Sequence, residues 1–131
     1  MSESYFDIID GKPVIRDKFV SRQEVERIVV GFGQLLMNQL QRFFRHCRKL
    51  ELQLRRKEKT WPEIRASIQM LSAHAENAAQ RPRDRVPQSF VDFIHRNVAM
   101  IQTDRDFRDG FMKHFEAVMG YAPKHLGRSD R

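Results

Sequence analysis

Apolar side chains recur along most of this chain at helical intervals. In the longest such stretch they follow alternating steps of four and three residues: Leu36, Leu40, Phe43, Cys47, Leu50 and Leu54. This spacing puts the side chains on one face of a helix, as in a coiled-coil seam. The pattern predicts a long helix over about residues 36–59, with the seam turned inward.

Four further helices are predicted from the same periodicity and from capping signals. Three of the expected starts carry a residue suited to the N-cap: Ser21 with Glu24, Thr60 with Glu63, and Thr103 with Asp104 and Asp106. The first of these helices is expected to end near residues 33–36, and a helix over about 88–101 follows a loop over 81–87 that holds two prolines. The fold class is therefore an all-α, single compact bundle of about five helices.

The first twenty residues differ from the rest in pattern. An Asp10–Gly11 turn signal separates two short apolar runs, which taken alone favours a hairpin. Pro13 would interrupt the second strand, so we interpret the segment as an extended N-terminal arm with one turn. The expected organisation is an arm over residues 1–20, a helical bundle domain over 21–127 and a flexible tail over 128–131.

The composition adds a strong positive charge. Lysine and arginine number 24 against 17 aspartates and glutamates, which gives a formal net charge of +7 over 131 residues. Such an excess favours an anionic partner, namely nucleic acid, an acidic protein surface or anionic lipid, and the alternative is a merely soluble basic protein. A single cysteine, the lack of an apolar run long enough for a membrane span and an N-terminus unlike a secretory signal predict a cytoplasmic protein with no membrane partner.

Much of this charge falls on the long central helix. On a helical wheel the cations lie opposite the seam, within an arc of roughly 140° at about 100° per residue. They are Arg42, Arg45, Arg48, Lys49, Arg55, Arg56 and Lys59. The acids of the stretch, Glu51 and Glu58, fall toward the seam, so we expect an outer face free of carboxylates. Phosphates would neutralise such a face, although a solvated surface or an acidic protein partner also accounts for it.

A second basic cluster lies in the proline-rich loop. Arg81, Arg83 and Arg85 alternate with other residues there, and a guanidinium group donates two hydrogen bonds to a phosphate at once. A plain surface loop held by Asp84 is the alternative. Most aromatic residues have core spacing, whereas Phe44, Trp61 and Tyr121 lie near the seam edges and are candidates for stacking on a base.

Signals for catalysis are weak throughout the sequence. The histidines, at positions 46, 74, 95, 114 and 125, fall in separate segments, and no pair has the H-x-x-x-H spacing of a helical metal site. Cys47 lies on the apolar seam, where a thiol packs more often than it reacts. We therefore predict no catalytic residue, no metal site and no cofactor.

Three short motifs resemble the small helical subunit family of type III-A (Csm) CRISPR effector complexes. They are Tyr5-Phe6-Asp7 with Gly11, then Asn38-Gln39-Leu40-Gln41-Arg42-Phe43-Phe44, and Phe115-Glu116-Ala117-Val118-Met119-Gly120-Tyr121 ending at Gly127. The chain departs from the family at Gln41, where the family has its first arginine, and over residues 73–78, which offer no arginine and leave Arg81 as a substitute.

The resemblance implies a bundle that stacks with copies of itself as an inner filament. It also implies contact with the guide RNA, the target RNA and other CRISPR effector subunits, with RNA cleavage elsewhere in the complex. The leading hypothesis is thus a non-catalytic RNA-binding structural subunit. A protein–protein adaptor whose basic helix docks an acidic partner and a small helical enzyme are the alternatives.

Overall fold

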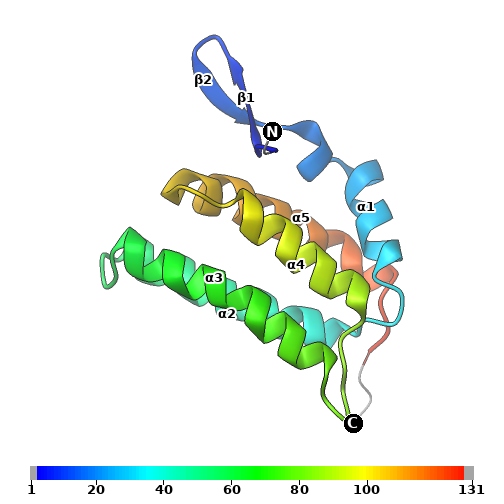
Figure 1. Ribbon diagram of the computed structural model, residues 1–131. Coiled ribbons are helices and arrows are strands. Elements are labelled where there is room, and N and C mark those ends of the chain that lie inside the picture. The colour runs from blue at the N-terminus through cyan, green and yellow to red at the C-terminus, as the bar shows by residue number, and fades with distance from the viewer. Residues whose placement is uncertain (1–2, 129–131) are drawn as a thin grey trace.

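Helices form 67% of the computed structural model, which describes residues 3–128. Within that range the α-helices are α1 (Arg22–Gly31), α2 (Met37–Arg55), α3 (Trp61–Ala79), α4 (Gln88–Met100) and α5 (Met112–Tyr121). Figure 1 shows α2 and α3 side by side as one layer, α4 and α5 as a second layer, and α1 across one end. The predicted all-α bundle is confirmed.

The predicted seam of α2 lies in the core between these layers. Its buried positions are Leu40, Phe43, Cys47 and Leu50. Phe43 packs edge-to-face on Phe90 of α4, with ring centroids 4.9 Å apart, and such pairs add about 0.5–1.5 kcal/mol beyond their buried area. Because this side of α2 is held in the core, the opposite side faces solvent.

The end of α2 is set by a left-handed residue. The helix ends at Arg55 because Lys57 adopts a φ of 61°. The Glu58 amide then donates to the Gln53 carbonyl at 2.9 Å, a hydrogen bond that closes helix C-termini. The predicted helix over 36–59 is therefore too long, and Lys59 lies in the turn that leads to α3.

The predicted capping box is present on α3 and absent on α1. The Thr60 amide donates to Oε1 of Glu63 at 2.9 Å, as the sequence predicts. Ser21 precedes α1 but its side chain makes no capping hydrogen bond within the described chain. Glu24 instead accepts from Arg27 at 3.2 Å, because a guanidinium one turn away competes for the same carboxylate.

The N-terminal segment is extended with one turn, as predicted, and its two halves also pair as a hairpin, which Pro13 had argued against. Strands β1 (Phe6–Ile9) and β2 (Lys12–Ile15) pair antiparallel around Asp10 and Gly11, both with positive φ. Pro13 lies opposite Ile8, one pair beyond the pair that flanks the two-residue turn. In such hairpins this second pair exchanges no backbone hydrogen bonds, so the missing N–H of proline costs no ladder bond.

The hairpin is tied to the bundle by a buried tyrosine. The Tyr5 hydroxyl donates to Oδ1 of Asn97 on α4 at 2.7 Å, and the side chain is fully buried. Its ring lies against Gly110, where an added Cβ would approach the ring to 2.6 Å. Gly110 belongs to a π-helical turn, Asp106–Phe111, which leads directly into α5. The described part of the chain contains no helix long and apolar enough to cross a membrane.

Of the predicted tail over residues 128–131, positions 129–131 lie outside the described residues.

Candidate nucleic-acid interface

A shallow groove of about 420 Å³ follows the solvent side of α2 and is called the basic groove below. It is lined by Phe44, Arg45, Arg48, Lys49, Leu52, Gln53, Arg56 and Glu58. The groove lies on this side because the opposite side of α2 packs in the core. Leu52 and Phe44, which are half-buried, form the apolar part of its lining. Cations therefore surround a partly apolar depression.

Three cations of the basic groove are exposed and unpaired. Arg45, Lys49 and Arg56 have no carboxylate within 4.0 Å among residues 3–128. Their charges reinforce one another across a surface whose lining includes one acid, Glu58, which is exposed here and does not lie toward the seam as predicted. Such a surface has a positive potential with free hydrogen-bond donors, which suits an anionic ligand.

The expectation of an outer face free of carboxylates is wrong for the other predicted arginines of α2. Arg48 pairs with Glu51 at 2.5 Å, and Arg55 reaches the same carboxylate at 3.7 Å. Glu51 is buried toward the seam, as expected, but long arginine side chains one turn away extend back to it. Arg42 is paired too, with Asp84 of the loop at 3.4 Å.

Arg48 is the most constrained of these arginines. Its guanidinium also lies 3.6 Å from Glu116 of α5 and 5.1 Å from the centre of the Phe44 ring. These contacts fix one cation of the basic groove in place. Phe44 in turn packs edge-to-face on Phe115, at 5.1 Å between ring centres, so one side of the groove is anchored to the core.

The three loop arginines are in different environments. Arg81 shares the Asp84 carboxylate with Arg42, at 3.7 Å. Arg83 and Arg85 are exposed and have no carboxylate within 4.0 Å in the described chain. Neither lines the basic groove, so of the three guanidinium groups the structure brings only that of Arg81 beside α2, while Arg85 contacts Gln39 of α2 through its main-chain carbonyl.

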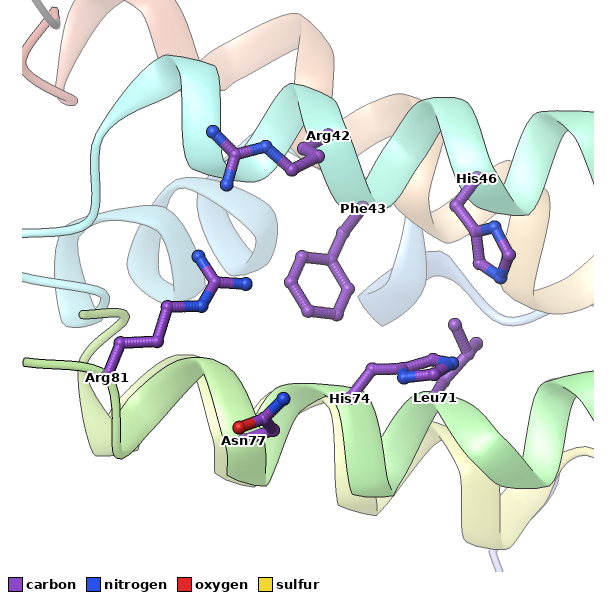
Figure 2. A pocket seen from close by; sticks show the side chains of 7 residues that line it. All are labelled: Arg42, Phe43, His46, Leu71, His74, Asn77 and Arg81. Atoms are coloured by element: carbon purple, nitrogen blue, oxygen red, sulfur yellow. The ribbon is translucent and has the colours of Figure 1, made fainter. Parts of the chain in front are cut away.

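A second depression, of about 290 Å³, lies between α2 and α3 and is called the α2–α3 cleft (Figure 2). Its lining residues are Arg42, Phe43, His46, Leu71, His74, Asn77 and Arg81. Sequence reasoning treated His46 and His74 as scattered and did not single out Asn77. The position of His46 four residues after Arg42, beside the seam, was the signal that could have indicated the cleft.

The cysteine and the remaining histidines are buried in the fold or bonded to other residues of it. Burial raises the pKa of the Cys47 thiol to about 12, so the thiolate does not form near neutral pH. His95 contacts Glu76 at 2.6 Å, His125 contacts Glu26 at 2.9 Å, and His114 contacts the Phe19 carbonyl at 2.6 Å. In residues 3–128 there is no group of three side chains placed to hold a metal ion.

Fold and site together define a small helical protein with a cationic groove on the outside of a packed bundle. Residues 21–127 match the family model described as Csm2 Type III-A, so the chain belongs to that family. The family consists of structural small subunits, and the chain is accordingly a type III-A CRISPR effector subunit whose partners are the other subunits of that complex. No curated protein and no solved structure matches the chain.

The motifs that carried the resemblance have structural roles here. Phe115 and Val118 are buried in the core, and Glu116 is turned outward near Arg48. The Gly127 carbonyl accepts from the Met37 amide at 2.9 Å, which ties the C-terminal end of the motif to the start of α2. The C-terminal motif thus holds α2, and with it the basic groove, in place.

Proposed function

We propose that the chain is a non-catalytic RNA-binding structural subunit that lines the duplex of guide and target RNA within the cytoplasmic type III-A complex. The observation that carries this proposal is the basic groove, where Arg45, Lys49 and Arg56 are exposed without a carboxylate partner among the described residues. In the proposal these three side chains make the principal phosphate contacts.

Phosphate binding explains why unpaired cations are retained on α2. Like charges on one face repel, and polyanion binding relieves that repulsion while releasing condensed counterions. Contacts to phosphates carry no sequence information, which suits a subunit whose target is chosen by base pairing between guide and target. Arg42, Arg48 and Arg55, which are paired in the free chain, and Lys59, Arg83 and Arg85 extend this surface.

We also propose that copies of the chain stack as an inner filament. Figure 1 shows that the hairpin extends beyond the helical layers. Its Ile8 and Ile9 side chains are 70% and 53% exposed. Val14 on the paired strand is exposed as well. By the strand register Ile9 and Val14 share one face of the hairpin and Ile8 lies on the other, and exposed apolar side chains of this kind are typical of contacts that become buried in an assembly.

The experiment reverses two charges in the basic groove. The full chain carrying Arg45→Glu and Lys49→Glu is compared with the unchanged chain for RNA binding over a range of salt concentrations. Because each lost phosphate contact removes about one counterion, the slope of log K against log salt should become shallower by about two. The control variant, Lys12→Glu with Arg65→Glu, makes the same change in net charge at exposed positions outside the groove.

Binding in the control should stay close to that of the unchanged chain. An equal loss of slope in both variants would contradict the proposal, since only net charge would then matter. Loss of binding to an acidic effector subunit, with RNA affinity and salt slope unaltered, would instead favour the adaptor function.

A further inference from the structure

The α2–α3 cleft has two chemically different ends. Figure 2 shows Arg42 and Arg81 at one end and His46 and His74 at the other, with Phe43 between the two helices. Its volume of about 290 Å³ lies just below the range typical of drug-sized ligand pockets, about 300–1,000 Å³. The cleft therefore suits a small ligand with an anionic part and a flat part.

The arginine end has an excess of positive charge. Arg42 and Arg81 approach a single oxygen of Asp84, at 3.4 Å and 3.7 Å. Gln39 fixes the other oxygen of this carboxylate, with its Nε2 donating at 3.0 Å. Two guanidinium groups thus share one acceptor at long distances, and most of their N–H donors stay free for a phosphate.

The histidine end offers two imidazole rings. The His46 and His74 rings lie 6.0 Å apart, nearly perpendicular to each other. The pKa of His46 is lowered by partial burial and by the nearby charges of His74 and Lys49, so its ring is neutral near pH 7. A neutral imidazole can stack on a base and both donate and accept hydrogen bonds at its edge.

Two other side chains complete the recognition surface. Asn77 on α3 lies between Arg81 and His74, where its amide can meet the edge of a base (Figure 2). Phe43 is only 9% exposed and is held by its packing on Phe90, so the floor of the cleft is formed before any ligand arrives. A rigid floor reduces the ordering cost of binding.

The cleft adjoins the basic groove around α2. At about 100° per residue, Lys49 of the groove, Arg42 and His46 fall within an arc of roughly 60°. The influence of the Lys49 charge on His46 agrees with that closeness. An RNA strand with a phosphate bound to Lys49 would therefore pass the opening of the α2–α3 cleft.

We propose that the α2–α3 cleft binds one nucleotide of the RNA strand, with the phosphate at its arginine end and the base at its histidine end. This inference rests on the proposed function, because the basic groove delivers the strand. It adds a base contact to a surface that otherwise meets only phosphates.

The test compares two RNA probes of about twelve nucleotides, an oligouridine and the same backbone without bases. Stacking of one base predicts that the full chain prefers the oligouridine by about tenfold. His74→Ala should abolish the preference, and His74→Phe should restore part of it, because a phenyl ring still stacks. His95→Ala, at a half-buried histidine outside the cleft, is the matched control and should keep the full preference.

Equal affinity of the unchanged chain for the two probes would overturn the inference, as would a preference that survives His74→Ala. Failure of the proposed RNA-binding function would give a different result, because neither probe would then show salt-dependent binding. A second measurement follows the imidazole NMR signals of His46 and His74. Uridine monophosphate should shift both, and the same shifts with inorganic phosphate alone would reduce the cleft to an anion site and contradict nucleotide binding.

Discussion

Helices α1 and α2 both carry arginines that pair with acids, but α2 also carries cations that have no acidic partner among residues 3–128. On α1, Arg22 pairs with Glu26 at 3.0 Å and Arg27 pairs with Glu24 at 3.2 Å, one turn away along the same helix. On α2, Arg45, Lys49 and Arg56 have no such partner among residues 3–128. The difference teaches that a count of basic residues does not mark a binding face, whereas cations left unpaired do.

The acids of the two helices also differ in burial. Replacing the buried acid of α2 should therefore have the largest effect on stability. Glu51 of α2 is buried and pairs with Arg48 and Arg55, so replacing it by glutamine leaves Arg55 without a carboxylate and Arg48 with only the more distant Glu116. Because both arginines are partly exposed, we expect Glu51→Gln to lower the free energy of unfolding by about 2 kcal/mol, less than for a fully buried pair. Urea denaturation measures this.

The control for that experiment is Glu24→Gln on α1, which breaks an exposed pair and should cost less than about 0.5 kcal/mol. Equal losses in the two variants would mean that burial of Glu51 does not distinguish the helices.

A carboxylate introduced into the basic groove should pair with the free cations of α2, as the glutamates of α1 pair with its arginines. Gln53 lines the groove four residues after Lys49 and three before Arg56. Gln53→Glu would pair with these cations and repel phosphate, and we expect RNA affinity to fall on the order of tenfold. The matched control is Gln23→Glu on α1, which adds the same charge away from the groove and should leave affinity unchanged. A similar loss from both would contradict the role of the groove.

Lowering the pH should decrease the free energy of unfolding without changing how the basic groove binds phosphates. His114 is buried against the Phe19 carbonyl, and burial lowers its pKa below the ordinary 6.5. As pH falls below about 6.5 the unfolded chain takes up a proton that the native chain resists, so stability decreases. Urea denaturation at pH about 7.5 and 5.5 measures this decrease, and His114→Gln should flatten it.

Affinity of the folded protein for the base-free RNA probe should stay constant over the same range, since the arginines and lysines that would hold its phosphates do not titrate there. Affinity that changes while the chain stays folded would point to histidines, not the cations of α2, as the main contacts.

Removing the acidic partner of an arginine on α1 should have the smallest effect on RNA affinity. Glu24→Gln leaves Arg27 without its partner, yet Arg27 lies outside the basic groove. We expect RNA affinity to rise less than about twofold, because an isolated exposed charge adds little beyond net charge. Fluorescence anisotropy at two salt concentrations resolves such a change, and a rise comparable to the loss from Gln53→Glu would show that position is unimportant.

The sequence predicted the bundle because its signals are local. The α2 seam and the Thr60–Glu63 capping box depend on residues within a few turns, and both are present. The hairpin was missed because whether Pro13 is tolerated depends on its pairing register. The family resemblance rested on short motifs and is confirmed by the family match over residues 21–127.

The candidate site was predicted less completely, since its ion pairs join distant elements. The contact of Arg42 with Asp84 spans 42 positions in sequence, and that of Arg48 with Glu116 joins α2 to α5. No wheel drawn for one helix can show them. The Arg48–Glu51 pair has i,i+3 spacing and was visible in the sequence.

The most direct measurement is a structure of the assembled type III-A complex with guide and target RNA bound. We predict that the charged groups of Arg45, Lys49 and Arg56 lie about 2.7–2.9 Å from phosphate oxygens, the distance of charge-assisted hydrogen bonds. Finding these side chains against carboxylates of a neighbouring subunit, or in solvent away from either RNA strand, would contradict it.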